Sequence, residues 1–141
     1  MSYEDLTDVI NSMDDETVEQ VLALFAGLEL TVTRPPCSGL VMFTVKDGFE
    51  TDFHIGEVLV TEARVMFKGY EGFGMVLGES PRRALAKAAS DALLRCPETT
   101  GICENLQAYL KQQKSLRTKK LMESSLLIAA TKVNFDLMPG A

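Results

Sequence analysis

The stretch whose residues could most readily bind a ligand or take part in catalysis is Gly72–Leu94, "GFGMVLGESPRRALAKAASDALL". Glycines ahead of a helix are typical of loops that bind phosphate, because the N–H groups of a helix N-terminus attract anions. The nucleotide-binding patterns fail here. Gly69 and Gly74 have P-loop spacing, but Met75 stands in place of the lysine. Gly72 and Gly74 lack the third glycine of GxGxxG, and no strand of a βαβ unit precedes them.

Two arginines remain as a candidate anion site at the helix that follows. Ser80 suits the cap and Pro81 the first helical position, so Arg82 and Arg83 fall in the first turn. They are candidate contacts for an anion at the helix N-terminus. The alternative is a pair of solvated arginines that slightly oppose the helix dipole.

No other residues form a recognisable catalytic or metal-binding constellation. His54 is the single histidine, and a structural role for it is the alternative to a general base. Glu57 and Glu62 have odd spacing, which places them on opposite faces of a strand. The sequence lacks a Ser-His-Asp set, an HExxH motif and paired cysteines. We therefore expect no catalytic residues, no metal and no cofactor, and the residues do not indicate a self-contained enzyme.

The cysteines and the N-terminus indicate a reducing compartment. The three cysteines, an odd number, are Cys37, Cys96 and Cys103, which favours reduced thiols. The first residues, "MSYEDLTDVI", are acidic and lack the apolar region of a signal peptide. No apolar run approaches the roughly 18 residues needed to cross a bilayer. The expected location is the cytoplasm, without membrane contact.

Apolar periodicity predicts two short N-terminal helices and a sheet. The helical positions are Leu6, Val9, Ile10 and Met13, then Val18, Val21, Leu22 and Phe25. Asp14-Asp15 can cap the second helix and Gly27 suits its end. The predicted strands cover residues 28–33, 39–45, 49–55, 56–67 and 73–78. Pro35-Pro36 should stop the first strand, and Asp47-Gly48 is a hairpin signal. No helix separates the strands, so we expect an antiparallel meander.

Two helices should close the chain. The first runs from Pro81 to Cys96-Pro97, with an apolar stripe of Ala84, Leu85, Ala88, Ala89, Ala92 and Leu93. Its alanines allow close approach to the sheet. The second runs from near Glu104 to about Ser124, and its sparse apolar positions predict an exposed helix or one that faces another chain. The tail after it is apolar, which is typical of a segment that packs on something. The predicted class is α+β.

Charge is distributed unevenly along the chain. The net charge is −6, and residues 1–36 hold eight acids against one base, Arg34. Five bases lie between Glu104 and Glu123: Lys111, Lys114, Arg117, Lys119 and Lys120. Overall acidity disfavours nucleic-acid binding. The basic segment either meets an acidic partner or phosphorylated ligand, or is a solvated helix face.

Three blocks of residues resemble the PhnG family of the bacterial carbon–phosphorus lyase system. The block "GEVLVTEARV" carries Gly56, Glu57, Leu59, Val60, Thr61, Ala63 and Val65. The second carries Gly72, Gly74, Val76, Leu77 and Gly78, followed by Asp91, Ala92, Leu93 and Leu94. The tail "ATKVNFDLMPG" matches at Ala130, Val133, Phe135, Met138 and Gly140. The sequence departs from the family pattern at Glu62, where arginine is common, at Glu79-Ser80, and at Asn134 and Pro139 in the tail.

The resemblance implies a single PhnG-like domain over residues 1–141 in a multisubunit complex with PhnI-, PhnH- and PhnJ-like partners. That complex degrades organic phosphonates. It first forms α-D-ribose 1-methylphosphonate 5-triphosphate from ATP and methylphosphonate, a transferase step, and a radical iron–sulfur subunit later cleaves the carbon–phosphorus bond. PhnG-like subunits have no recognised catalytic residues. Residues from about 130 to 141 would be a partner-docking tail, with contacts through Val133, Asn134, Phe135, Asp136 and Met138.

Two other hypotheses stay open. The chain could be an independent binding module for a phosphorylated ligand, through Arg82, Arg83 and the basic segment. It could also form a homodimer or larger homo-oligomer through its long helices when partners are absent.

Overall fold

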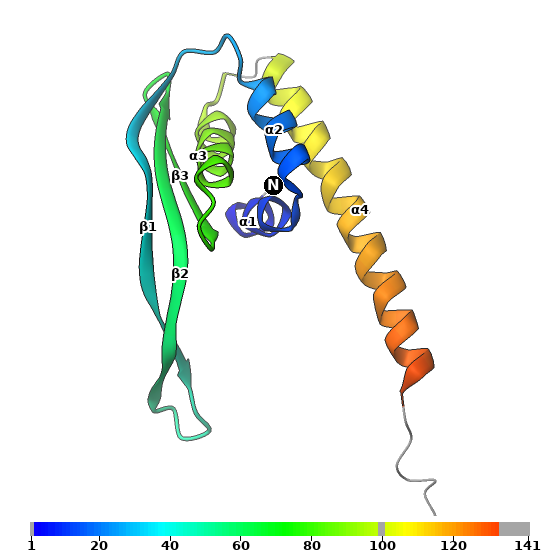
Figure 1. The fold of residues 1–141 in the computed structure, drawn as a ribbon. Coiled ribbons are helices and arrows are strands. Elements are labelled where there is room, and N and C mark those ends of the chain that lie inside the picture. The colour runs from blue at the N-terminus through cyan, green and yellow to red at the C-terminus, as the bar shows by residue number, and fades with distance from the viewer. Residues whose placement is uncertain (1, 99–100, 133–141) are drawn as a thin grey trace, which may run out of the picture.

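The computed structural model describes residues 2–98 and 101–132 and has the predicted α+β architecture (Figure 1). Within these residues the elements are α1 (Tyr3–Ser12), α2 (Asp15–Leu24), β1 (Leu30–Lys46), β2 (Asp52–Phe67), β3 (Tyr70–Leu77), α3 (Pro81–Arg95) and α4 (Gly101–Thr131). The strands form one antiparallel sheet in the order β1-β2-β3. Helix α3 lies against β2 and β3, α1 and α2 lie against α3, and α4 packs on the outside of α1 and α2.

The two N-terminal helices begin at side-chain caps. Ser2 Oγ accepts a hydrogen bond from the Asp5 N–H at 3.1 Å, and the Asp5 carboxylate reaches back to the Ser2 backbone. Asp14 caps α2 by accepting from the Thr17 N–H at 2.8 Å. These bonds satisfy N–H groups that a helix start otherwise leaves unpaired. The predicted apolar stripes are confirmed as core, because their members are buried or half-buried against α3 and α4.

The prediction of five strands is wrong, because the chain forms three longer ones. Strand β1 runs through Pro35-Pro36 without ending. Those prolines lie in an edge strand, whose outer side has no neighbouring strand, so a missing N–H on that side removes no hydrogen bond. The register shift between Arg34 and Cys37 accommodates the two prolines in the pairing with β2. Strand β2 likewise passes through Gly56, opposite a register shift between Phe43 and Thr44. Asp47 does form the predicted hairpin turn, since its Oδ1 accepts from the Phe49 and Thr51 N–H groups.

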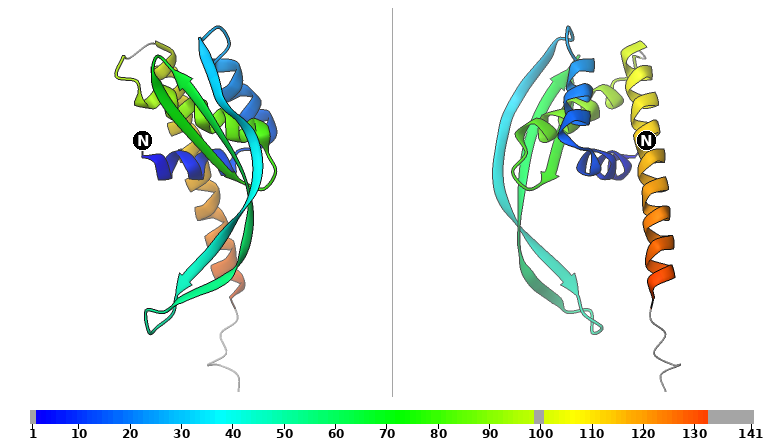
Figure 2. Two further views of the ribbon diagram at one scale, coloured as in Figure 1. Left: turned by 90° about the vertical axis from the view of Figure 1, so that its left-hand side faces the viewer. Right: turned by 45° about the vertical axis from the view of Figure 1, so that its right-hand side comes forward.

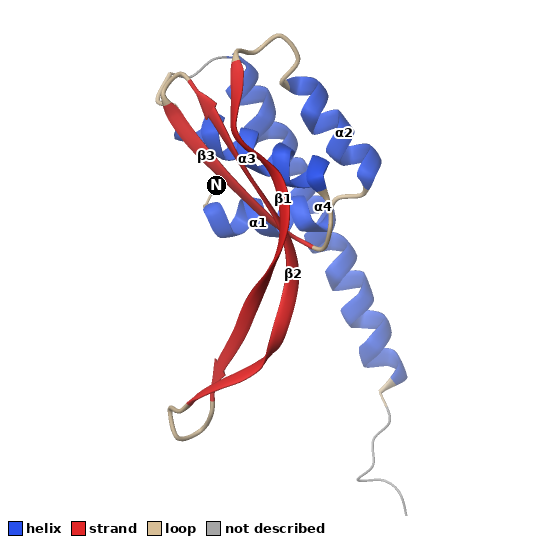
Figure 3. Ribbon diagram, turned by 60° about the vertical axis from the view of Figure 1, so that its left-hand side comes forward, coloured by secondary structure: helices blue, strands red, loops and turns tan. Residues whose placement is uncertain are grey.

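Helix α3 sits unusually close to β3, as its alanines predict. A Cβ built on Gly72 would lie 2.0 Å from the Ala88 carbonyl oxygen, and one on Gly74 would lie 2.2 Å from the Ala84 carbonyl oxygen. Only glycine permits this approach. The helices gather on one face of the sheet (Figure 3). The glycines therefore serve helix–sheet packing.

Helix α4 is longer than predicted and leaves the body of the protein. It runs from Gly101 to Thr131, whereas the sequence predicted about 104 to 124. Its buried residues are Cys103, Leu106 and Leu110, all in its first turns. After Arg117 every described residue of the helix is exposed, and Figure 2 shows its last turns extending past the other helices. The predicted exposure of this helix is confirmed.

None of the helices in residues 2–98 and 101–132 is both long enough and apolar enough to span a bilayer.

Candidate functional site

The β1–β2 hairpin extends beyond the rest of the sheet. Strand β3 stops at Leu77, opposite Val60, so β1 and β2 continue alone from the Leu40–Leu59 pair to the turn at Asp47. We call residues 40–59 the β-arm. Figure 2 shows it extending past α1, α2 and α3. An isolated two-stranded ribbon is marginally stable in water, so a surface that covered the arm would stabilise it.

Both faces of the β-arm are apolar. Leu40, Val41, Met42 and Phe43 are consecutive and all exposed, and successive strand residues point to opposite faces. The remaining large apolar residues exposed on the arm are Val45, Phe49, Phe53, Ile55 and Leu59. Monomeric proteins seldom expose contiguous apolar surface of this kind unless it is a binding site.

The last turns of α4 form a second uncovered apolar surface. We call residues 118–132 distal α4. Its exposed apolar side chains are Leu121, Met122, Leu126, Leu127 and Ile128. Leu126, Leu127 and Ile128 are consecutive and about 70% exposed, so they point in three directions around the helix. A helix that is apolar on several sides is normally buried, and the described residues supply nothing to bury this one.

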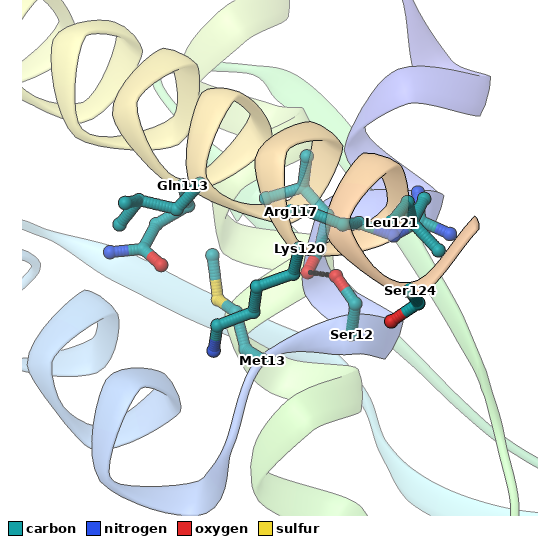
Figure 4. A pocket seen from close by; sticks show the side chains of 9 residues that line it. Ser12, Met13, Gln113, Arg117, Lys120, Leu121 and Ser124 are labelled. Atoms are coloured by element: carbon teal, nitrogen blue, oxygen red, sulfur yellow. Dashed lines mark hydrogen bonds between the residues drawn. The ribbon is translucent and has the colours of Figure 1, made fainter. Parts of the chain in front are cut away.

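A groove of about 280 Å³ separates the end of α1 from the middle of α4 (Figure 4). It is lined by Val9, Ser12, Met13, Gln113, Leu116, Arg117, Lys120, Leu121 and Ser124. Ser12 Oγ donates to the Val9 carbonyl oxygen at 2.9 Å, so the serine is already engaged. The groove offers apolar walls and the cations of Arg117 and Lys120, and its far end joins distal α4.

The basic segment of α4 meets the chain's own acidic helix. Lys114 Nζ lies 2.6 Å from Asp5 Oδ1, and Arg117 Nη1 lies 3.4 Å from Asp8 Oδ2. The hydrogen bond from Lys114, assisted by Ser2, lowers the pKa of Asp5 to about 2. The basic segment of α4 and the acidic residues of α1 thus partly neutralise each other within the chain, and their ion pairs orient α4 on α1.

Arg82 and Arg83 also have partners within the chain. Arg82 Nη2 donates to Glu19 Oε2 at 2.6 Å, and its Nε bonds the other oxygen of Glu19. Arg83 Nη2 donates to the Met13 carbonyl oxygen at 2.8 Å and to Asp15 Oδ1 at 3.2 Å. These bonds pin the start of α3 to α2. Anion binding by the two arginines stays a prediction, and an anion would have to compete with Glu19 and Asp15.

The family-motif residues divide into two groups. Gly56 and Glu57 lie on the exposed β-arm. Thr61 and Gly78 meet where β3 turns into α3: Thr61 Oγ1 donates to the Gly78 carbonyl oxygen at 2.7 Å and accepts from the Ser80 N–H at 3.0 Å. Gly78 has a φ of +76°, a conformation that favours glycine. Ser80 occupies the predicted cap position, but its side chain makes no capping bond, so that detail of the prediction is wrong.

Replacing Thr61 with valine should lower the free energy of unfolding by about 2 kcal/mol, because the partly buried Gly78 carbonyl and Ser80 N–H both lose their partner. Urea denaturation of the isolated chain measures this. Thr33→Val is the matched control, since Thr33 is exposed on β1 and should change stability by less than about 0.5 kcal/mol. Equal stabilities of the two variants would contradict the role given to Thr61.

One departure from the family pattern has a partner. Glu62, which stands where arginine is common in the family, lies 2.8 Å from Arg34 Nη2 across the β1–β2 pair. A neighbouring cross-strand pair joins Arg64 to Glu71 at 2.9 Å. The sheet face opposite α3 is therefore a surface of paired charges. Exposed pairs of this kind contribute at most about 1 kcal/mol each.

A buried lysine was missed by sequence reasoning. Lys87 lies on α3 with 1% of its surface exposed. Its Nζ donates to the Met75 carbonyl oxygen and to Tyr3 Oη, both at 3.0 Å, and lies 4.1 Å from the centre of the Tyr3 ring. Burial lowers the pKa of Lys87 to about 8, against the opposing effect of Asp91. Its burial could have been predicted from its position three residues after Ala84, which places it on the alanine stripe that faces the sheet.

Lys87 belongs to a set of polar side chains that close the outer edge of β3. The Phe73 N–H donates to Asp91 Oδ2 at 2.9 Å, and the Leu77 N–H donates to Asn11 Oδ1 at 3.3 Å. Lys87 binds the Met75 carbonyl between them. Alternate residues of a strand present their backbone groups to the same edge. Three polar side chains thus take the place of a fourth strand.

The remaining predicted residues are placed as follows. Val133, Asn134, Phe135, Asp136 and Met138 lie outside the described residues. His54 lies on the β-arm, with its Nδ1 2.9 Å from Thr44 Oγ1. Cys96 and Cys103 are buried and Cys37 is exposed, and the Cys103 thiol donates to the Leu93 carbonyl oxygen at 3.7 Å. Across residues 2–98 and 101–132, no group of three or more histidine, cysteine or acidic side chains could hold a metal ion.

These features define an α+β chain with a covered helical core and two apolar extensions that the core does not cover. None of the curated proteins matches it. A family model described as "Phosphonate metabolism protein PhnG" matches residues 4–140. The chain belongs to the PhnG family, and the family expected from the sequence motifs is confirmed. Its role lies in phosphonate metabolism.

Proposed function

We propose that this chain is an accessory subunit of a carbon–phosphorus lyase core complex in the cytoplasm. With PhnI-, PhnH- and PhnJ-like subunits it is required to form α-D-ribose 1-methylphosphonate 5-triphosphate from ATP and methylphosphonate. The observation that carries the proposal is the pair of apolar extensions, the β-arm and distal α4. Membership of the PhnG family supplies the metabolic context.

The energetics of the extensions support a subunit role. Covering one large apolar side chain contributes about 1.5–3 kcal/mol, and the arm exposes nine such residues over 20 positions. The summed contribution is comparable with, or larger than, the roughly 4–15 kcal/mol that association costs in lost translational and rotational freedom. The chain would therefore be a scaffold whose uncovered surfaces bind subunits that do the chemistry.

The first test is reconstitution of the reaction. Purified PhnI-, PhnH- and PhnJ-like subunits should form the ribose 1-methylphosphonate product, detected by ³¹P NMR, only when this chain is present. Product formation at an undiminished rate without the chain would overturn the proposal.

The second test concerns the docking tail, residues 130–141 as predicted from the sequence. Deleting residues 131–141 should abolish co-purification with a PhnI-like subunit. The deletion removes residues beyond the buried part of α4, which ends at Leu110, so the circular dichroism spectrum and urea midpoint should change little. A truncated chain that still co-purifies would show that the tail is not the docking element.

The independent ligand-binding hypothesis makes a different prediction. It requires the isolated chain to bind ATP or methylphosphonate in a calorimetric titration with a dissociation constant below about 10 μM, and to lose binding in the Arg82→Ala/Arg83→Ala variant. Because both guanidinium groups already bind carboxylates, we expect no such binding. Light scattering of the isolated chain separates the homodimer hypothesis from both.

A further inference from the structure

The β-arm has one strand edge that continues the line of β3. The last bond on that side runs from the Gly78 N–H to the Leu59 carbonyl oxygen at 2.8 Å. Beyond it, within the described residues, β2 pairs only with β1 from Leu59 back to Asp52. By strand alternation the N–H and C=O of Glu57 point to the same side as the Leu59 carbonyl. We call residues 52–58 the open β2 edge.

The other sheet edges are less suited to a new strand. Asn11, Lys87 and Asp91 occupy the outer edge of β3. Near the body of the sheet, the edge of β1 is interrupted by Pro35-Pro36 and by two register shifts, which are devices that blunt edge pairing. The open β2 edge has one irregularity of its own, the extra residue Ile55 at the shift between Phe43 and Thr44. A strand added along the open β2 edge would lie end to end with β3 and would keep the sheet three-stranded through the arm (Figure 3).

The acidic charge of this edge indicates which kind of strand can bind there. Asp47, Glu50, Asp52 and Glu57 lie on or beside it, and the single lysine or arginine of the β-arm is Lys46, the cross-strand partner of Asp52. A second copy pairing antiparallel through the same edge would bring acidic side chains against acidic side chains, which is destabilising in cross-strand pairs. A strand that carries lysine or arginine among apolar residues would complement both the charge and the apolar faces.

We propose that the open β2 edge binds an extended strand of another protein chain, apolar with basic residues, by β-strand addition. The inference rests on the proposed function, because the occupant is a segment of one of the complex subunits. The added strand would satisfy the free backbone groups of residues 52–58. Its side chains, and the surface that carries them, would cover the apolar faces of the arm. Main-chain bonds supply affinity in this mode of recognition, and the side chains supply specificity.

Hydrogen–deuterium exchange is the direct test. It compares the isolated chain with the assembly purified after co-expression with PhnI-, PhnH- and PhnJ-like subunits. The outward amides of residues 52–58 should exchange about 100-fold more slowly in the assembly, as hydrogen-bonded amides do. Fast exchange there in an intact assembly would overturn the inference while leaving the proposed function standing. If no assembly forms with the wild-type chain, both fail.

Charge reversal on the same edge is the second measurement. The Asp52→Lys/Glu57→Lys variant should weaken capture of the partner subunits at least about tenfold, with the urea midpoint unchanged. Glu16→Lys/Glu29→Lys is the matched control, because both glutamates are exposed and lie off the arm, and it should bind as the wild type does. Equal affinities of the two variants for the partner subunits would show that the occupant is not a basic strand. Protection of residues 52–58 that grows with the concentration of the isolated chain would show that the occupant is a second copy and not another protein.

Discussion

Replacing Gly74 with alanine should destabilise this chain by about 3 kcal/mol or more, the upper range for overpacking a core. The new Cβ would lie 2.2 Å from the Ala84 carbonyl oxygen and 2.7 Å from the Ala88 backbone nitrogen. These atoms are helix backbone, so no side-chain rotation can relieve the overlap. Either α3 moves off the sheet or the chain stays unfolded, because a domain of this size has only about 5–15 kcal/mol of stability.

The urea midpoint and the soluble yield measure this effect. Gly72→Ala should behave similarly, because its Cβ would lie 2.0 Å from the Ala88 carbonyl oxygen. Gly39→Ala is the matched control: it is a strand glycine in β1 with nothing within 4 Å of the added carbon. The control should fold with wild-type stability. A well-folded Gly74→Ala protein would show that α3 does not lie where the structure places it.

The second large effect is a dependence of stability on pH caused by Lys87. Its folded-state pKa is about 8, below the ordinary value of 10.5. Between these values the unfolded chain holds more protons than the folded one, so stability rises with pH in this window. Each pKa unit corresponds to about 1.4 kcal/mol. The free energy of unfolding should therefore increase by about 2 kcal/mol between pH 8 and pH 10.

The comparison variant is Lys87→Met, which keeps the apolar stem and cannot titrate. The increase between pH 8 and pH 10 should be absent in this variant and present in Lys111→Met, since Lys111 is exposed on α4. The window stops at pH 10, because burial raises the pKa of Tyr3, and ionisation of that phenol reverses the slope above its ordinary value. Parallel curves for the wild type and Lys87→Met would contradict the buried charge.

Much of the fold followed from local patterns. The 3.6-residue spacing of Leu6, Val9 and Ile10 predicted α1, and Ser80-Pro81 marked the start of α3. The alanine stripe of α3 predicted close approach to the sheet, because residues without bulky side chains are needed wherever two backbones approach. These signals succeed because they depend on the geometry of one element, or of two that adjoin in sequence.

Strand ends and site contacts could not be read in the same way. Pro35-Pro36 would stop a central strand, and only the position of β1 at the sheet edge makes them tolerable. Arg82 and Arg83 looked like an anion site, since nothing local indicates that Glu19 and Asp15 lie opposite them. Nothing in the residues next to Lys87 indicates that it is buried between α1 and β3. Each outcome depends on a neighbour more than ten residues away.

The sequence by itself determined the family, the α+β class and the absence of a familiar catalytic motif, because these depend on residue types in linear order. The tertiary structure alone decided which apolar residues are covered. Leu6 and Leu126 are equally apolar in sequence, yet one is 1% exposed and the other 70%. The body of helices and sheet ends before the β-arm and distal α4 do, so these extensions have no neighbours of their own to bury them. That difference in burial is the physical basis for proposing that this chain works as part of a complex.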